Sequence, residues 1–199
     1  SNAIAGSLNL PYGYWTFGVT GSASDQRDEI SPVADSISQS GSLGLSVDRV
    51  LYRDANYILH AVASGNFYAS QRYINVTALS PQKEISGRFG SVIEAYFDGR
   101  QYYADAGFTY GRTQIGSGSG AQSYDYAKLD TSFQASVKIN ESSLLQLSAN
   151  GQFSSDELPS DQQMSIGGWS GVRAFPTSGA SGDSGIFGKV EYQRALELP

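Results

Sequence analysis

Few residues of this sequence have the types and spacing that catalysis requires. The 199 residues contain no cysteine and a single histidine, His60. This excludes disulfides, cysteine-held zinc and thiol nucleophiles, and it argues against a Ser-His-Asp triad or a multi-histidine metal site. The glycine-serine alternation at 116–120 lacks the helix and the lysine that a phosphate-binding loop uses, since a strand pattern follows it. The sequence therefore predicts no enzyme activity, no catalytic residue, no cofactor and no metal site.

The most informative stretch contains Arg173, within a predicted loop at 156–184 that is rich in glycine and serine. A loop of this length either lacks order or folds back onto another part of the protein. Val172 and Phe175 flank this arginine, and such apolar neighbours favour a loop that folds back. The guanidinium would then meet a carboxylate on an inner wall, because a buried arginine requires an anionic partner.

The elements that would position these residues are strands. Apolar and polar residues alternate with period two over long segments, and no segment has a convincing 3.6-residue stripe. The predicted strands are 12–24, 39–52, 55–70, 84–97, 100–114, 124–139, 143–155 and 185–196. These are far longer than the ~5–6 residues usual in soluble proteins. The pattern predicts an all-β fold.

The connections between these strands alternate between short and long. The short ones are 53–54, Asp98-Gly99 and 140–142, and the long ones are 25–38, 71–83, 115–123 and 156–184. Long amphipathic strands in even number with this alternation are typical of an antiparallel transmembrane β-barrel of the bacterial outer membrane. Aromatic residues gather near the strand ends, as in interfacial girdles. The alternative is a soluble barrel that carries an apolar ligand and turns its apolar face inward.

A barrel in lipid must expose one apolar face. We predict that this outward face carries the odd-numbered residues of most strands and the even-numbered residues of 100–114. The test positions are Trp15, Leu45, Leu59, Phe89, Phe108, Phe133 and Leu147. We also expect a tight turn at Asp98-Gly99, because this dipeptide tolerates the positive φ of a two-residue hairpin.

The composition further narrows the classes of protein to which this sequence can belong. The formal net charge is −6, with 19 acidic and 13 basic residues and no basic cluster, which argues against a nucleic-acid partner. Aromatic residues make up 12% of the chain, so disorder is not expected. No apolar run approaches the ~18 residues of a membrane helix, and no signal peptide is visible. Residues 1–3 are interpreted as the remnant of an expression tag, leaving 4–199 as the protein proper.

The loop around Arg173 resembles a family signature. Its residues match the pattern GG-x-x-x-VR-G/A-F/Y of the two-partner secretion transporters, the haemolysin-activator and filamentous-haemagglutinin transporter family. The matching positions are Gly167, Gly168, Val172, Arg173, Ala174 and Phe175. Stretches 10–15, 50–54 and 151–153 also resemble that family's barrel, so the resemblance covers nearly all of 8–196. Ala174 departs from the glycine that the wider superfamily prefers.

The resemblance implies a 16-stranded barrel preceded by a plug helix and two periplasmic polypeptide-transport-associated domains. About eight of those strands are expected here, so the chain is interpreted as an internal barrel fragment. The acidic partner of Arg173 would then lie in later strands, outside this chain. The predicted function is an outer-membrane pore component that translocates an unfolded exoprotein, either a haemolysin or an adhesin.

Polar residues that alternate with the apolar ones would line the conduit. The lumen candidates are Arg88, Glu94, Asp105, Asp130 and Lys138. The expected partners are the secreted exoprotein, outer-membrane lipid and, during biogenesis, the barrel-assembly machinery. The alternative is a complete small eight-stranded outer-membrane protein that acts as an adhesin, an anchor or a lipid-modifying enzyme.

Overall fold

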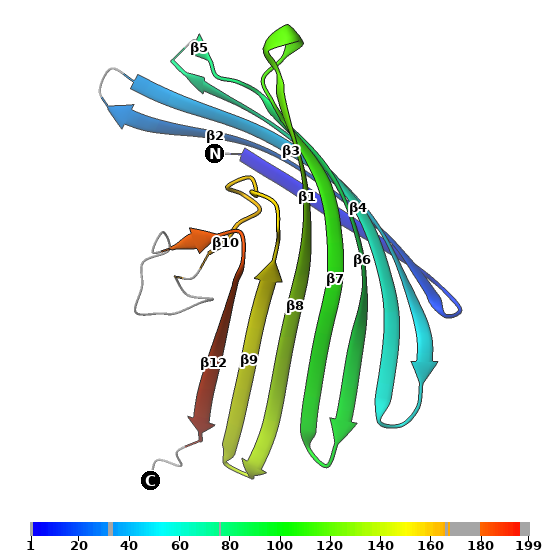
Figure 1. Cartoon of the computed structure of the whole chain (residues 1–199). Helices are drawn as coiled ribbons and strands as arrows, with labels where there is room; N and C mark the ends of the chain where they lie inside the picture. Colours follow the sequence, from blue (N-terminus) through cyan, green and yellow to red (C-terminus); the bar gives the residue numbers. More distant parts are fainter. Residues whose placement is uncertain (1, 32–33, 76, 166, 168–179, 196–199) are drawn as a thin grey trace. The chain divides into compact units, whose positions relative to one another are not determined.

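The computed structural model describes residues 2–31, 34–75, 77–165, 167 and 180–195, and its strands are labelled in Figure 1. The strands are β1 (Asn2–Tyr12), β2 (Trp15–Ser31), β3 (Ala34–Arg53), β4 (Tyr57–Ile74), β5 (Thr77–Ala78), β6 (Gln82–Phe97), β7 (Arg100–Ile115), β8 (Gln122–Asn140), β9 (Ser143–Phe153), β10 (Met164–Ser165), β11 (Ser181–Gly182) and β12 (Gly185–Arg194). A 3-10 turn, η1, occupies Gly118–Gly120. Over the described ranges, no helix is long and apolar enough to cross a membrane. The predicted all-β fold is confirmed.

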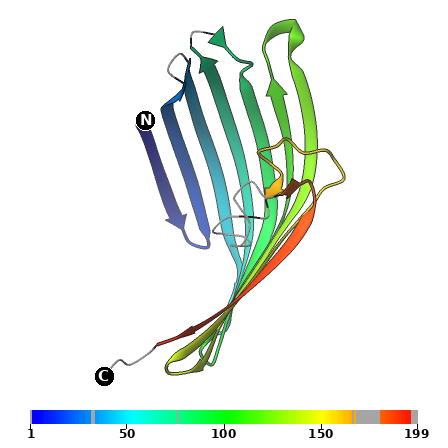
Figure 2. The ribbon, with the colours of Figure 1, turned by 90° about the vertical axis from the view of Figure 1, so that its left-hand side faces the viewer.

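Strands that follow one another along the chain are neighbours in one sheet. Their hydrogen-bonded order is β1-β2-β3-β4-β6-β7-β8-β9-β12, with β5 attached to β4 (Figures 1 and 2). The short strands β10 and β11 form a separate antiparallel pair inside the connection from β9 to β12. The topology is therefore an antiparallel meander in which every long strand pairs with its neighbours in sequence.

The chain divides into two compact units that are described separately. The first consists of Ser1–Asp48, Ala63–Arg88 and Tyr110–Asp125, and the second of Arg49–Val62, Phe89–Thr109 and Tyr126–Pro199. Strands β3, β4, β6, β7 and β8 contribute residues to both units, whereas β1 and β2 belong to the first unit and β9 and β12 to the second.

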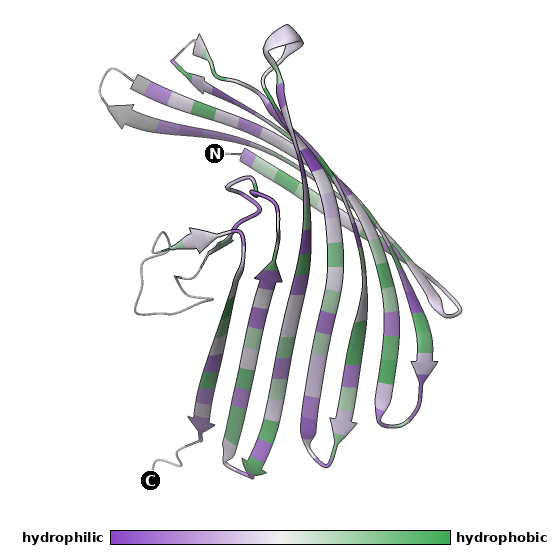
Figure 3. Cartoon of the chain, viewed as in Figure 1, coloured by the Kyte–Doolittle hydropathy of each residue, from purple (hydrophilic) through white to green (hydrophobic). Residues whose placement is uncertain are grey.

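The strand pairing places apolar residues opposite apolar residues. In the first unit Leu8 pairs with Val19. In the second unit Leu147 lies between Ala135 on β8 and Val190 on β12. Side chains of directly opposed residues share a face of the sheet, so within each unit the alternation predicted from sequence gives an apolar face. Figure 3 shows this alternation as bands of contrasting hydropathy along each strand.

The apolar face is exposed, as a lipid-facing surface must be. Phe89 is 68% exposed, Phe108 54% and Phe133 39%. The Thr113 hydroxyl donates to Glu84, so the odd-numbered residues of β7 share the polar face with the even-numbered residues of β6. Phe108, an even-numbered residue of β7, therefore lies on the apolar face with the odd-numbered residues of β6.

An aromatic cluster marks the end of the second unit that carries short turns. The rings of Tyr57 and Phe97 lie 4.9 Å apart between centroids in an edge-to-face arrangement, and Phe97 lies 6.4 Å from Tyr102. Edge-to-face geometry is favourable for aromatic pairs. The positions suit an interfacial girdle, since aromatic residues gather where membrane meets water.

One sequence prediction about elements is wrong, and one strand was missed. Strand β1 was not predicted, although Asn2 and Ala3 already pair with Asp25 and Ser24. The predicted loop at 25–38 is largely strand, because β2 continues to Ser31 and β3 begins at Ala34. The reason is cross-strand polar bonding: the hydroxyls of Ser24 and Ser40 lie 2.8 Å apart. Such pairs extend a sheet without any apolar periodicity to reveal it.

The Asp98-Gly99 turn is confirmed. Strand β6 ends at Phe97 and β7 begins at Arg100. Asp98 has a φ of 41° and Gly99 a φ of 75°, as a two-residue hairpin of type I′ requires at both central positions. This turn fixes the register that sends alternate residues of β6 and β7 to opposite faces.

Candidate functional site: a polar strand face and the base of the long loop

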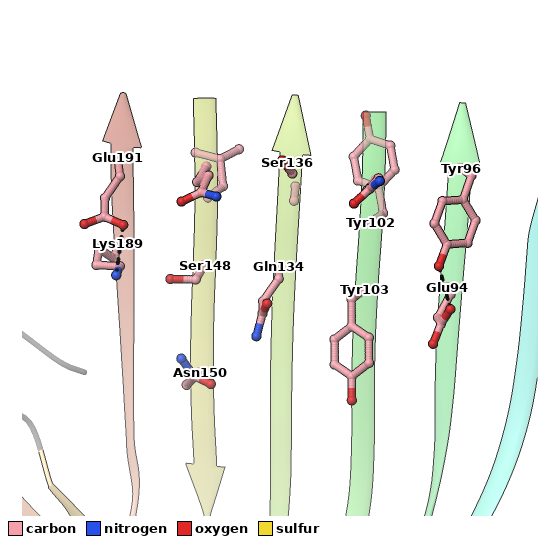
Figure 4. Close-up of a pocket in the computed structure, with 14 residues that line it drawn as sticks. Glu94, Tyr96, Tyr102, Tyr103, Gln134, Ser136, Ser148, Asn150, Lys189 and Glu191 are labelled. Carbon is pink, nitrogen blue, oxygen red and sulfur yellow. Dashed lines mark hydrogen bonds and ion pairs between the residues drawn. The ribbon is translucent and has the colours of Figure 1, made fainter. Parts of the chain in front are cut away.

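A polar pocket lies on the strand face opposite the apolar one, wholly within the second unit. It has a volume of about 540 Å³ and extends across β6, β7, β8, β9 and β12 (Figure 4). Its polar lining residues are Glu94, Tyr96, Gln101, Tyr103, Gln134, Ser136, Gln146, Ser148, Asn150, Lys189 and Glu191. Strand alternation explains the set, because every second residue of each strand points to this face.

Most of these groups are neutral hydroxyls and amides, and the charged ones have partners. The Tyr96 hydroxyl donates to Glu94 at 2.7 Å, and the Lys189 ammonium lies 3.1 Å from the Glu191 carboxylate. The surface therefore offers donors and acceptors without a dense field of one sign. Such a surface can hydrogen-bond to the backbone of any peptide and then release it.

The base of the long loop packs against this same polar face. Asp183 holds two parts of the loop together: its carboxylate accepts a hydrogen bond from the backbone of Leu158 and another from the side-chain amide of Gln163, each at 3.0 Å. Leu158 is 3% exposed. Residues before and after the loop tip are thereby joined at its base, next to the β10–β11 pair.

Gln152, on β9, connects the loop base to the strands. It is 6% exposed, and its amide nitrogen donates to the carbonyl oxygens of Gln162 at 3.0 Å and Asp183 at 3.2 Å. The Lys128 ammonium donates to the Gln152 side-chain oxygen at 3.2 Å and lies 3.6 Å from Asp130. Because unsatisfied buried polar groups are costly, these bonds hold the loop base at one place on the wall.

A third set of contacts fixes the loop to β8. Asp156 accepts a hydrogen bond from the backbone of Ala127 at 2.8 Å. The Ser154 hydroxyl donates to the Ala127 carbonyl at 2.7 Å, and the Ser184 hydroxyl donates to the Ser154 carbonyl at 3.0 Å. Ala127 on β8 and both ends of the loop are therefore bonded to one another.

The five lumen candidates all occupy polar positions of their strands. Glu94 lines the pocket. Asp130 accepts a hydrogen bond from Thr109 at 3.2 Å, beside Lys128. Arg88 and Asp105 are half-buried at other points, and Lys138 is exposed beside the turn that ends β8. Their role in lining a conduit stays a prediction.

Most of the predicted loop motif lies outside the described residues. Of its members, Gly167 is described and is buried. Gly168, Val172, Arg173, Ala174 and Phe175 fall among the residues whose structure is not described. The expectation for Arg173 therefore stays a prediction.

Sequence reasoning missed the loop base. Gln152 was visible as a polar-face residue, but nothing local marked it as an anchor. Asp183 lies in the SGDSG stretch at 181–185, whose small residues were the one available signal of a close approach between backbones. Across the described ranges, no group of three or more His, Cys, Asp or Glu side chains is placed to hold a metal ion.

The sequence matches the model of the haemolysin secretion/activation protein ShlB/FhaC/HecB family over residues 1–196. The chain belongs to this family. Members are outer-membrane β-barrel transporters of two-partner secretion, which agrees with the exposed apolar face and the polar opposite face. No curated protein sequence matches this one.

Two solved structures share the fold. CdiB from Escherichia coli superposes with a TM-score of 0.80 at 22% identity, covering 99% of this chain and 39% of that one. CdiB from Acinetobacter baumannii gives 0.79 at 19%, covering 99% and 37%. The chain thus spans less than two fifths of either transporter's length, and its strands form part of such a barrel.

Proposed function

We propose that this chain forms part of the wall of an outer-membrane pore through which an unfolded partner exoprotein is secreted. The observation that carries the proposal is the pocket across five strands, lined mostly by neutral amides and hydroxyls, on the face opposite the exposed apolar residues. The family implies a secreted partner protein. The proposed role is passage rather than chemistry, with no enzymatic step and no cofactor.

The wall suits an extended peptide because its groups are spaced along strands. A translocating chain presents backbone N–H and C=O groups whatever its sequence, and uncharged partners bind these weakly enough to let the chain advance. The outward face would contact outer-membrane lipid, and folding into the membrane would use the barrel-assembly machinery. No nucleic-acid partner is proposed.

The loop base supports a second element of the proposal, a loop held within the barrel. Gln152 and Asp183 join the start and end of the loop to the polar face. We infer that this anchorage presents the motif residues 167–175 to the lumen, where Arg173 would meet a carboxylate of the barrel.

Cysteine cross-linking during secretion tests the wall directly. The sequence contains no cysteine, so Ser148→Cys in the full-length transporter introduces a unique thiol into this part of the barrel. A stalled partner carrying a thiol-reactive probe should cross-link to it. The matched control is Phe133→Cys, on the apolar face, which should not react. Equal reaction at both positions, or at neither, would contradict the proposed pathway.

Arg173→Ala tests the loop. We expect lower secretion from a barrel that is still folded and inserted, because removing one partner of a buried ion pair commonly costs ~3–5 kcal/mol, and this cost falls on the docked loop. Heat-modifiability on gels is the folding control. Wild-type secretion would indicate a solvated arginine, whose substitution changes stability by no more than ~0.5 kcal/mol.

A further inference from the structure

An apolar groove opens on the outward face of the first unit. It has a volume of about 580 Å³, and five side chains from four neighbouring strands line it: Leu43, Leu45, Phe67, Ile85 and Tyr110. All five are between 44% and 62% exposed. In an outer-membrane barrel this face contacts lipid, so hydrocarbon must fill the groove.

Two glycines create the hollow. Gly65 on β4 and Gly87 on β6 lie side by side: a Cβ added to Gly65 would be 3.9 Å from the Ser86 carbonyl oxygen, and one added to Gly87 would be 3.8 Å from that of Ser64. Both are ordinary van der Waals distances, so the backbone does not require glycine at either position. The missing side chains instead leave a trough between Leu45 and Tyr110.

One end of the groove carries positive charge. Arg112 lines it and forms two bonds with Asp125, one of them at 2.8 Å. Lys83 is exposed and lies two residues before Ile85 on β6, hence on the same face. Two cations and one carboxylate thus lie where β6 begins and β7 ends, next to the connections 75–81 and 116–121.

We propose that this groove binds an acyl chain of a phosphorylated glycolipid of the outer leaflet, with its phosphate beside Lys83 and Arg112. The orientation follows from the connections, because in outer-membrane barrels the longer loops are extracellular. A lipid of this type has an apolar and an anionic end, matching the apolar trough and its cationic end. The proposal does not depend on what passes through the pore.

The amount of lipid that stays bound to the purified full-length transporter tests this proposal. The protein is extracted from outer membranes in mild detergent, and native mass spectrometry measures the lipopolysaccharide that remains bound. Gly87→Leu fills the trough. Leucine displaces two or three methylenes from the trough and should lower retention, because the acyl chain loses its van der Waals contacts there. The matched control is Gly21→Leu, on the apolar face of β2, whose added Cβ would also lie 3.8 Å from a backbone oxygen, that of Ser42; retention should not change.

A charge variant keeps the test decisive if Gly87→Leu fails to fold. Lys83→Gln leaves the trough unchanged and should weaken lipopolysaccharide retention, with a smaller dependence on salt. Secretion should stay at the wild-type level in both variants, which separates this proposal from the proposed transport function. Unchanged retention in a folded Gly87→Leu protein overturns the proposal. So does selective loss of phospholipid instead, or loss of a dimer, which would make the occupant a second copy.

Discussion

The two faces of β8 and β9 use the same backbone in opposite ways. On the outward face Phe133 lies opposite Ala149, and its side chain is 39% exposed. An apolar side chain of this kind needs no hydrogen-bond partner. On the inward face Gln152 is buried and bonded to the loop base. Lipid covers the outward face, whereas the base of the protein's own loop packs against the inward face. The difference teaches that alternate residues of one strand can have separate structural roles.

The largest effect is predicted for a charged substitution on the outward face. Phe133→Lys places a charge where lipid is expected, which costs ~2–4 kcal/mol near the bilayer midplane. Gln134→Lys, one residue further, points into the polar pocket and should cost far less. Urea unfolding of the full-length transporter in vesicles measures both. Equal losses at the two positions would mean that the faces are not distinguished by lipid and water.

The next prediction loosens the loop base. Asp183→Ala removes the acceptor for the Leu158 amide and the Gln163 side chain. Leaving buried donors unsatisfied costs ~1–3 kcal/mol. We expect faster proteolysis within 156–184, with the strands still folded. Glu157→Ala, at an exposed neighbouring carboxylate, is the control. Wild-type protection in the Asp183 variant would show that other contacts carry the anchorage.

A third prediction concerns the turn that keeps the two faces in register. Gly99 has a φ of 75°, and left-handed backbone costs a residue with a side chain ~1–2 kcal/mol. Gly99→Ala should therefore destabilise the β6–β7 hairpin, whereas Gly6→Ala, which would meet nothing within 4 Å, should not. Hydrogen exchange in β6 and β7 measures the effect, and equal protection in the two variants would contradict it.

The smallest predicted effect depends on pH, at the turn between β3 and β4. The Asn56 backbone N–H donates to the Asp54 carboxylate at 2.7 Å, and together with the Tyr52 hydroxyl and the Tyr57 backbone it lowers the pKa of Asp54 below its ordinary value of 3.8. The folded turn is therefore favoured above pH 3.8 and loses this contribution as pH falls through the lower folded-state pKa. NMR titration of the Asn56 amide follows it, with Asp54→Asn as the pH-independent control.

A structural feature could be predicted from the sequence when neighbouring residues alone carry the pattern that specifies it. The hairpin at Asp98-Gly99 was predictable because the dipeptide itself favours positive φ. The eight amphipathic strands were predictable because the pleat repeats every two residues. The extension of β2 and β3 past residue 25 was not, since it depends on serine pairs such as Ser24 and Ser40, which form only once the strands are in register.

The sequence by itself determined the all-β class, the alternation of apolar and polar faces along the eight strands that it predicted, and the resemblance to the transporter family through the pattern at 167–175. Only the tertiary structure decided which polar residues become anchors. Gln152 and Asp183 are 31 positions apart, and Gln152 meets backbone carbonyls, which every residue possesses and which no side-chain pattern distinguishes. Likewise, Gly65 and Gly87 form a groove only because the register of β4 and β6 places them side by side.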